Sequence, residues 1–206
     1  MTTNDIFGGD GSGNLANDGQ YVEIYHIPSG NTIKFKAMMT QFEDAYTSEW
    51  NSEAAYGRMD PIQTFQRTGR VISIAFSVPA YSRKEAHGNL QRISALVQFL
   101  YPSYDGAGLL KNSPYCKIQF MNWSAKNGAA SAAKTQGLLG TIGGFTFVPD
   151  LDAGVFHSKT GEDIAPKMVQ VAFQFTVIHE HKLGWQGDAL REPGLMYFPY
   201  GVETDT

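Results

Sequence analysis

The clearest strand signal in the chain is the stretch VQVAFQFTV at residues 169–177. Large apolar residues occupy every second position of it, and smaller or polar residues stand between them. A period of two places the apolar residues on one face of a β-strand, which should turn that face toward a core. A second stretch, RVISIAFSV at residues 70–78, alternates large apolar residues with small ones in the same way. Both stretches predict β-strands.

Shorter patterns extend the β prediction to most of the chain. Residues 21–36 are typical of a hairpin, in which YVEIYHI and TIKFK flank a turn at residues 28–31. Further strands are expected at residues 115–121 and 138–148, and the glycines of the second stretch predict a bulge or a close backbone approach. The predicted fold class is mainly β (α+β).

One helix is expected to interrupt the strands at residues 82–101. Ser82 and Glu85 have the spacing of a capping box, and Pro102 should end the helix. Apolar residues recur between them at spacings of three and four: Ala86, Leu90, Ile93, Val97 and Leu100. This period predicts an amphipathic helix that buries Leu90, Ile93 and Val97 of that series against a sheet.

The chain divides into an arm and a domain. Residues 1–20 contain five glycines and few groups that offset the entropy of ordering, so we expect a flexible N-terminal arm that neighbouring subunits hold in place. No repeat or linker divides residues 21–206, which are expected to form a single β-rich domain. The small, polar stretch at residues 124–136 predicts a long loop.

Composition excludes several classes of protein. Apolar residues make up 42% of the chain, which is typical of a folded protein, and a net charge of -4 disfavours general nucleic-acid binding. The single cysteine rules out an internal disulfide and a cysteine-rich zinc site. No apolar run is long enough to span a membrane, so we expect no membrane insertion and synthesis in a cytoplasm.

Sequence motifs of catalysis are missing. The chain has neither a P-loop nor a GxSxG nucleophile elbow, and we predict no enzyme activity, no catalytic residue, no cofactor and no metal site. His179 and His181 point to one side of a strand, so a metal pair stays open beside a reading as polar residues at a strand end. Asp150 and Asp152 are either an acid–base pair or turn residues, and Cys116 is expected to be a buried filler.

Charge is distributed unevenly along the chain. Residues 1–57 hold two basic and eight acidic residues, residues 58–149 hold ten and three, and residues 150–206 hold four and nine. The corresponding net charges are -6, +7 and -5. An acidic start and end around a basic middle suits head-to-tail contacts between copies, although a merely mixed surface is an equal alternative.

Aromatic and arginine residues mix in the stretch at residues 42–70. Such a mixture is typical of interface centres, with a long loop packed on its own barrel as the alternative. The candidate interface residues are Trp50, Tyr56, Arg58, Phe65, Arg67 and Arg70. We expect the arginines to meet carboxylates of an adjacent subunit.

Several stretches together resemble structural proteins of bacteriophage tails, of the group that forms the tube end and the baseplate. They are YGRMDPIQTFQRTGR, VISIAFSVPA, the helix from SRKEAHGNL to FLYPSY, and HEHKLGW. The resemblance implies a tail-tube-like antiparallel β-barrel or sandwich with one flanking α-helix and long loops. It also implies a ring of copies, expected to be hexameric, that contacts neighbouring tail tube and baseplate proteins in the virion. The family offers no catalytic residues to transfer.

Two other functions stay open. A carbohydrate- or peptidoglycan-binding module would use Trp50, Trp123 and Trp185 to stack on sugar rings. A hydrolase would combine the two histidines at 179 and 181 with the two aspartates at 150 and 152.

Overall fold

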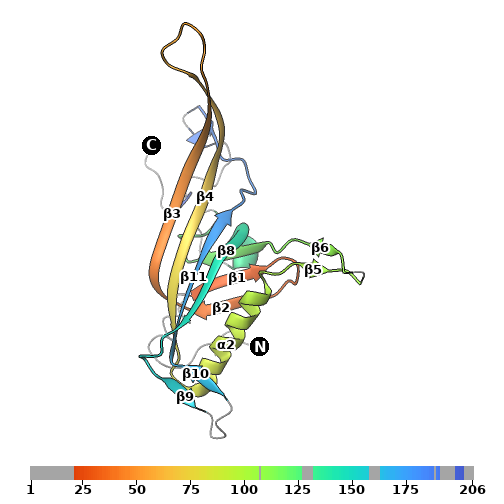
Figure 1. The fold of residues 1–206 in the computed structure, drawn as a ribbon, viewed down its shortest axis with the longest axis vertical. Helices are drawn as coiled ribbons and strands as arrows, with labels where there is room; N and C mark the ends of the chain where they lie inside the picture. Colours follow the sequence, from red (N-terminus) through yellow and green to blue (C-terminus); the bar gives the residue numbers. More distant parts are fainter. Residues whose placement is uncertain are drawn as a thin grey trace.

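A seven-stranded antiparallel sheet organises the chain, in the order β2-β1-β7-β8-β11-β4-β3 (Figure 1). The computed structural model describes residues 21–106, 108–126, 132–157, 163–187, 189–190 and 198–201. The strands of the sheet are β1 (Tyr21–His26), β2 (Thr32–Lys36), β3 (Met38–Glu53), β4 (Ile62–Pro79), β7 (Cys116–Phe120), β8 (Leu138–Pro149) and β11 (Met168–Val177). The prediction of a mainly β fold with one flanking helix is confirmed.

Smaller hairpins extend from the sheet at its periphery. They pair β5 (Ser103–Tyr104) with β6 (Leu110–Asn112), β9 (Val155–His157) with β10 (Ile164–Pro166), and β12 (Trp185–Gln186) with β13 (Ala189–Leu190). In Figure 1, β9 and β10 lie at one end of the molecule, and β5 and β6 project sideways.

The core forms where the two alternating stretches pair. β11 lies beside β4 with Val171 opposite Phe76 and Phe173 opposite Ile74, and these side chains are buried. The rings of Phe76 and Phe173 meet edge to face with their centroids 6.3 Å apart, a favourable geometry for aromatic pairs. The period of two therefore predicted both strands and their buried faces.

The main sheet is open in the described residues, so of the β-barrel or sandwich that the resemblance implied, a closed barrel does not form there. The edge strands are β2 and β3, and neither pairs with a further strand on its outer side. Helix α2 (Arg83–Gln98) packs against β2. The sheet thus keeps two unpaired edges.

Helix α2 begins as its sequence predicts and ends earlier, at Gln98. The Ser82 hydroxyl accepts a hydrogen bond from the backbone N–H of Glu85, as an N-cap residue does. The Glu85 carboxylate accepts from the N–H of Tyr81 at 2.7 Å and pairs with the buried Lys36 ammonium at 2.6 Å. One carboxylate therefore satisfies the helix terminus and fixes the helix to the sheet.

The buried stripe of α2 differs from the predicted one. Leu90 and Val97 are half-buried, whereas the buried positions are Ala86, Asn89, Ile93 and Leu96. Asn89 is tolerated on this stripe because its side chain is satisfied, since it donates to the carbonyl of Pro79 and accepts from Arg92. The spacing of the apolar residues alone could not reveal that a polar residue lies at the centre of the buried stripe.

The glycines of β8 have the expected roles. The register between β8 and β11 shifts after Ala172, and Gly144 lies in this irregular part with a φ of +61°. At Gly140, a Cβ atom would clash with the backbone oxygen of Thr176 and with the Phe175 ring. Glycine is therefore required at 140 for close approach and at 144 for a left-handed backbone.

The predicted loop at 124–136 is partly ordered and buried. Ser124 and Ala125 are fully buried, and the Ser124 hydroxyl accepts from the N–H of Phe120. Residues Ala133–Gln136 form the short helix α3, while residues 127–131 and the N-terminal arm at 1–20 lie outside the described residues. In the described part of the chain, no helix has the length and hydrophobicity needed to cross a bilayer.

Replacing Leu96 with Ala should lower the free energy of unfolding by about 2 to 5 kcal/mol, because this side chain is fully buried beneath α2. The matched change Leu90→Ala should cost clearly less, since Leu90 is half-buried on the same helix. Urea denaturation of both variants measures the difference. Equal losses would contradict the buried stripe described above.

Candidate assembly interface

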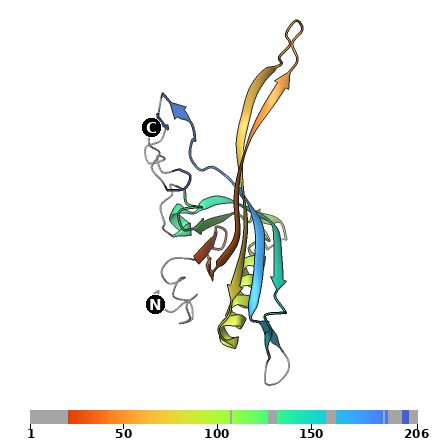
Figure 2. The same cartoon turned by 90° about the vertical axis from the view of Figure 1, so that its left-hand side faces the viewer.

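The longest feature of the structure is a hairpin of β3 and β4 that extends beyond the sheet (Figures 1 and 2). β11 pairs with β4 only from Val71 to Pro79, whereas β3 accompanies β4 out to Ile62. Between Ile62 and Gly69, both faces of this two-stranded ribbon are therefore exposed. The alternative of a long loop packed on its own barrel is wrong, because these residues pair as strands.

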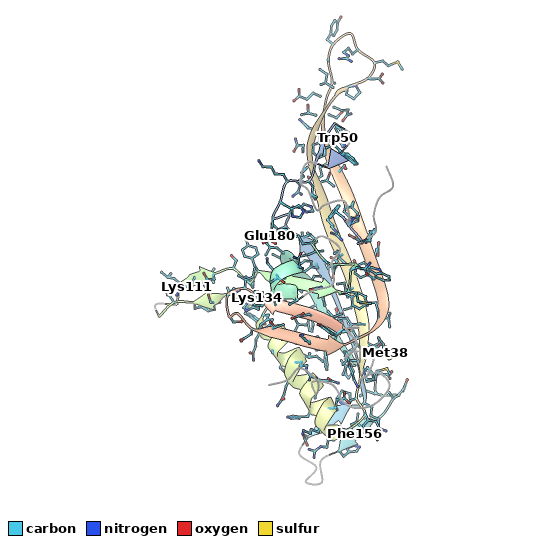
Figure 3. The ribbon with its side chains drawn as sticks, turned by 180° about the vertical axis from the view of Figure 1, so that it is seen from behind. Met38, Trp50, Lys111, Lys134, Phe156 and Glu180 are labelled. Carbon is cyan, nitrogen blue, oxygen red and sulfur yellow. The ribbon has the colours of Figure 1, made fainter. Side chains whose placement is uncertain are left out.

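The outer hairpin is held by cross-strand side chains. Trp50 lies opposite Phe65, beside a register shift, and their rings meet edge to face at 5.2 Å. Each ring still exposes more than half of its surface, 57% for Trp50 and 52% for Phe65. Figure 3 places Trp50 on the projecting part of the hairpin, far from Phe156 on the β9–β10 hairpin. This aromatic pair is available to a partner.

The tip of the hairpin carries two more of the candidate residues. Tyr56 and Met59 are fully exposed, and Arg58 is exposed in the same turn, which Gly57 makes possible with a φ of +82°. Large apolar side chains are seldom this exposed without a partner. We call the exposed residues of the tip and of the outer ribbon together the hairpin surface: Trp50, Tyr56, Arg58, Met59, Ile62 and Phe65.

Arg67 pairs within its own chain. Its guanidinium donates to both oxygens of the Glu49 carboxylate, at 2.7 and 2.8 Å, from directly across the hairpin. These hydrogen bonds lower the pKa of Glu49. Both side chains are exposed to solvent, so the pair fixes the register of the ribbon more than it stabilises the fold.

Arg70 differs from the other candidates because it is fully buried. It donates to Asp44 through Nε at 2.9 Å and through Nη2 at 2.7 Å, and the exposed fraction of the Asp44 side chain is only 4%. The guanidinium also lies over the ring of Tyr46, 5.2 Å from its centre. Its carboxylate partner is thus in the same chain, and Arg70 has no part in the exposed hairpin surface.

The Asp44 carboxylate also accepts a hydrogen bond from a residue near the C-terminal end of the chain. The hydroxyls of Tyr46 and Tyr200 both donate to its Oδ2 atom, at 3.1 and 3.2 Å. Asn122 donates to the backbone oxygen of Tyr200, and the Phe198 ring lies 5.6 Å from Arg70. Burial and the Asp44 charge raise the pKa of both tyrosines, so they stay protonated as donors. Residues 198–201 are thereby fixed at the base of the hairpin.

Sequence reasoning missed Asp44, Tyr46 and Tyr200. The sequence did contain a signal for Asp44, because an acidic residue and an arginine lie in two stretches that a hairpin turn could join. Tyr46 pairs with Arg70 in the register, which makes Asp44 the diagonal neighbour of Arg70. Finding it required the register, and two irregularities in β3 shift that register.

The structure separates the residues of the hydrolase alternative. Asp150 donates its N–H to the carbonyl of Met168 at the start of β11, while His179 follows the end of β11. A ten-residue strand separates these points, which corresponds to about 30 Å. The Asp150 carboxylate instead accepts from the backbone N–H groups of Asp152 and Ala153, as a turn residue does.

The space beside His179 and His181 is small. The cavity that they line together with Phe198 measures about 10 Å³, less than a substrate needs. Burial, followed by the charges of Arg70 and His181, lowers the pKa of His179. No cluster of three or more metal-binding side chains occurs among the residues that the structure describes.

Cys116 is buried in β7, as expected of a residue that only fills space in the core. Burial raises the pKa of its thiol to about 12. A thiol with this pKa stays protonated near neutral pH and is a poor nucleophile.

Comparison with known proteins gives little. No protein-family model matches the chain, and no curated protein matches it. A solved structure that aligns with it is the crystal structure of the SPP1 Dit (gp 19.1) protein, described as a paradigm of the hub adsorption apparatus in phages that infect Gram-positive hosts. The identity is 10% and the TM-score 0.40, and the alignment covers 76% of this chain and 49% of that one.

Replacing Asp44 with Asn should lower the free energy of unfolding by about 3 to 5 kcal/mol, because the buried Arg70 charge loses its partner. Glu49→Gln is the matched control, since it removes the carboxylate of the exposed pair on the same ribbon and should change stability little. Urea denaturation compares the two. A loss for Asp44→Asn no larger than that of the control would contradict the role of the buried pair.

Proposed function

We propose that this chain is a non-enzymatic structural subunit of a bacteriophage tail and forms a ring with copies of itself. The resemblance of its sequence stretches to tail proteins gives the setting, which is the junction of tail tube and baseplate. The subunits assemble in the host cytoplasm and remain in the virion. A hexameric ring would have neighbouring tube and baseplate proteins as its other partners.

The observation that carries this proposal is the projecting β3–β4 hairpin. A two-stranded ribbon is marginally stable by itself in water, and this one exposes aromatic and apolar side chains along its outer half. Burying the hairpin surface against another subunit would remove that apolar area from water. The ribbon is therefore better explained as a contact arm between subunits than as part of the chain's own core.

The open sheet supports the same proposal. The unpaired edges of β2 and β3 lie at opposite ends of the strand order. Edges of this kind are sites for pairing with other chains. Two different contact surfaces on one subunit give a head-to-tail interface, and a head-to-tail interface closes into a ring when the rotation between copies allows it.

The carbohydrate-binding alternative has weaker support. Trp123 packs against Phe42 and Phe120, with ring centroids 5.2 and 5.9 Å apart. Trp50 is on the outer hairpin, whereas Trp185 belongs to β12. The groove that α2 forms with β2 contains none of these tryptophans, so it offers no aromatic platform for a sugar.

The double change Trp50→Ala and Phe65→Ala should strongly weaken self-association while leaving the core of the sheet folded, because both rings are exposed and lie outside that core. Sedimentation velocity gives the mass of the assembly, and electron microscopy shows whether rings form. Tyr104→Ala is the matched control, since Tyr104 is equally exposed but lies on the β5–β6 hairpin.

If the double variant still forms rings like those of the wild type, the hairpin surface is not part of the interface. A wild-type chain that stays monomeric at every concentration, and that binds peptidoglycan fragments in the same buffer, would overturn the structural role in favour of the alternative.

A further inference from the structure

The open sheet curls until β3 meets the turn that follows β7. These two parts are not neighbours in the strand order, because β8, β11 and β4 lie between them. The ring of Phe42 on β3 is nevertheless 5.2 Å from that of Trp123 and 6.4 Å from that of Phe120. Arg70 of β4 also places its Nη2 atom 3.5 Å from the Trp123 carbonyl oxygen. Side-chain contacts, and no ladder between described strands, therefore close this seam.

The turn after β7 has a strained backbone. Met121 has a φ of +47°, in the left-handed region that residues other than glycine seldom adopt. Such a conformation persists where the surrounding structure holds it, and it is frequent at sites with a function. The next two residues both make contacts across the seam. Trp123 packs on the Phe42 ring, and the Asn122 side chain donates to the backbone oxygen of Tyr200.

Residues 198–201 cross the seam from one side to the other. The hydrogen bond from Asn122 holds the backbone of Tyr200 to the turn after β7. The hydroxyl of the same tyrosine donates to Asp44 on β3 at 3.2 Å. One short segment is thus tied to two parts of the sheet that share no backbone pairing. We call residues 198–201 the strap.

The strap meets the β3–β4 ribbon at its base, where the sheet stops supporting it. β4 has no β11 partner beyond Val71, and Arg70 is the next residue outward. The Phe198 ring lies 5.6 Å from the Arg70 guanidinium. Tyr200 bonds the Asp44 carboxylate that pairs with this guanidinium. Farther out, only β3 and β4 support each other, so contacts at the base decide the direction in which the ribbon projects (Figures 1 and 2).

We propose that the strap fixes the direction of the β3–β4 ribbon and thereby controls assembly. This inference rests on the proposed function, because the ribbon carries the hairpin surface that contacts the next copy. A ribbon held by the strap presents that surface in one direction, so a partner binds it without the entropy cost of ordering it. A ribbon without the strap keeps its strands but samples several directions, and only a fraction of them fit a ring.

The test variant is Phe198→Ala, Tyr200→Ala, which removes both side-chain contacts of the strap. Neither residue belongs to the hydrophobic core, so the sheet should stay folded. The matched control is Tyr101→Ala, Tyr104→Ala, which removes two exposed rings at the β5–β6 hairpin. Hydrogen exchange followed by mass spectrometry compares the full-length variants at a concentration below self-association. Sedimentation velocity then gives the concentration at which each variant forms rings.

Exchange of the backbone N–H groups of β3 and β4 beside Asp44 and Arg70 should become about tenfold faster in the test variant, because a hydrogen bond to a charged group is lost there. Exchange in β11 should change much less, whereas a role in general stability alone would move both regions together. The concentration needed for rings should also rise about tenfold, since fewer ribbons are in the binding direction. The control should match the wild type in both measurements.

Tyr200→Phe is a second, milder variant that loses only the hydroxyl bonded to Asp44. It should speed exchange at the same positions to a smaller extent, and it replaces the test variant if the latter does not fold. Exchange equal to that of the control, or rings at the wild-type concentration despite faster exchange, would overturn the inference and leave the proposed function in place. If the wild-type chain never self-associates, the proposed function is wrong, and the exchange comparison still decides whether the strap holds the ribbon.

Discussion

The buried ion pair of Arg70 and Asp44 is the constraint on which the rest of the structure depends. It lies where β4 loses its β11 partner and continues with β3 alone. A buried guanidinium without a carboxylate would destabilise the chain strongly, so Asp44 must face Arg70 and the register of the hairpin is fixed from its base. The same carboxylate accepts hydrogen bonds from Tyr46 and Tyr200, so one pair of charges also positions residues 198–201.

The sequence predicted those parts of the fold in which one face is buried. β11 and the inner half of β4 alternate with a period of two because their large side chains pack into one core. The outer half of the same hairpin is exposed on both faces, so no alternation marks it and it was not recognised as strand. On α2, the period was right and the buried stripe was wrong, because buried Asn89 is satisfied by partners from outside the apolar pattern.

The composition of the sequence indicated which residues gather in the candidate site, but it could not show how those residues pair in space. Aromatic residues and arginines do gather in residues 50–70, and most of them are exposed there. The arginines, however, were expected to meet another subunit, whereas Arg67 and Arg70 meet Glu49 and Asp44 of their own hairpin. The acidic first segment and the basic middle of the sequence therefore neutralise each other partly within one chain. Charge totals along a sequence do not show which strands are neighbours.

This internal pairing changes what an assembly contact on the hairpin has to be. With the charges of Glu49 and Arg67 already matched across the ribbon, a contact on the outer hairpin would rest chiefly on its exposed aromatic and apolar side chains. Contacts of that kind depend on shape and on the area removed from water, and they are screened little by salt.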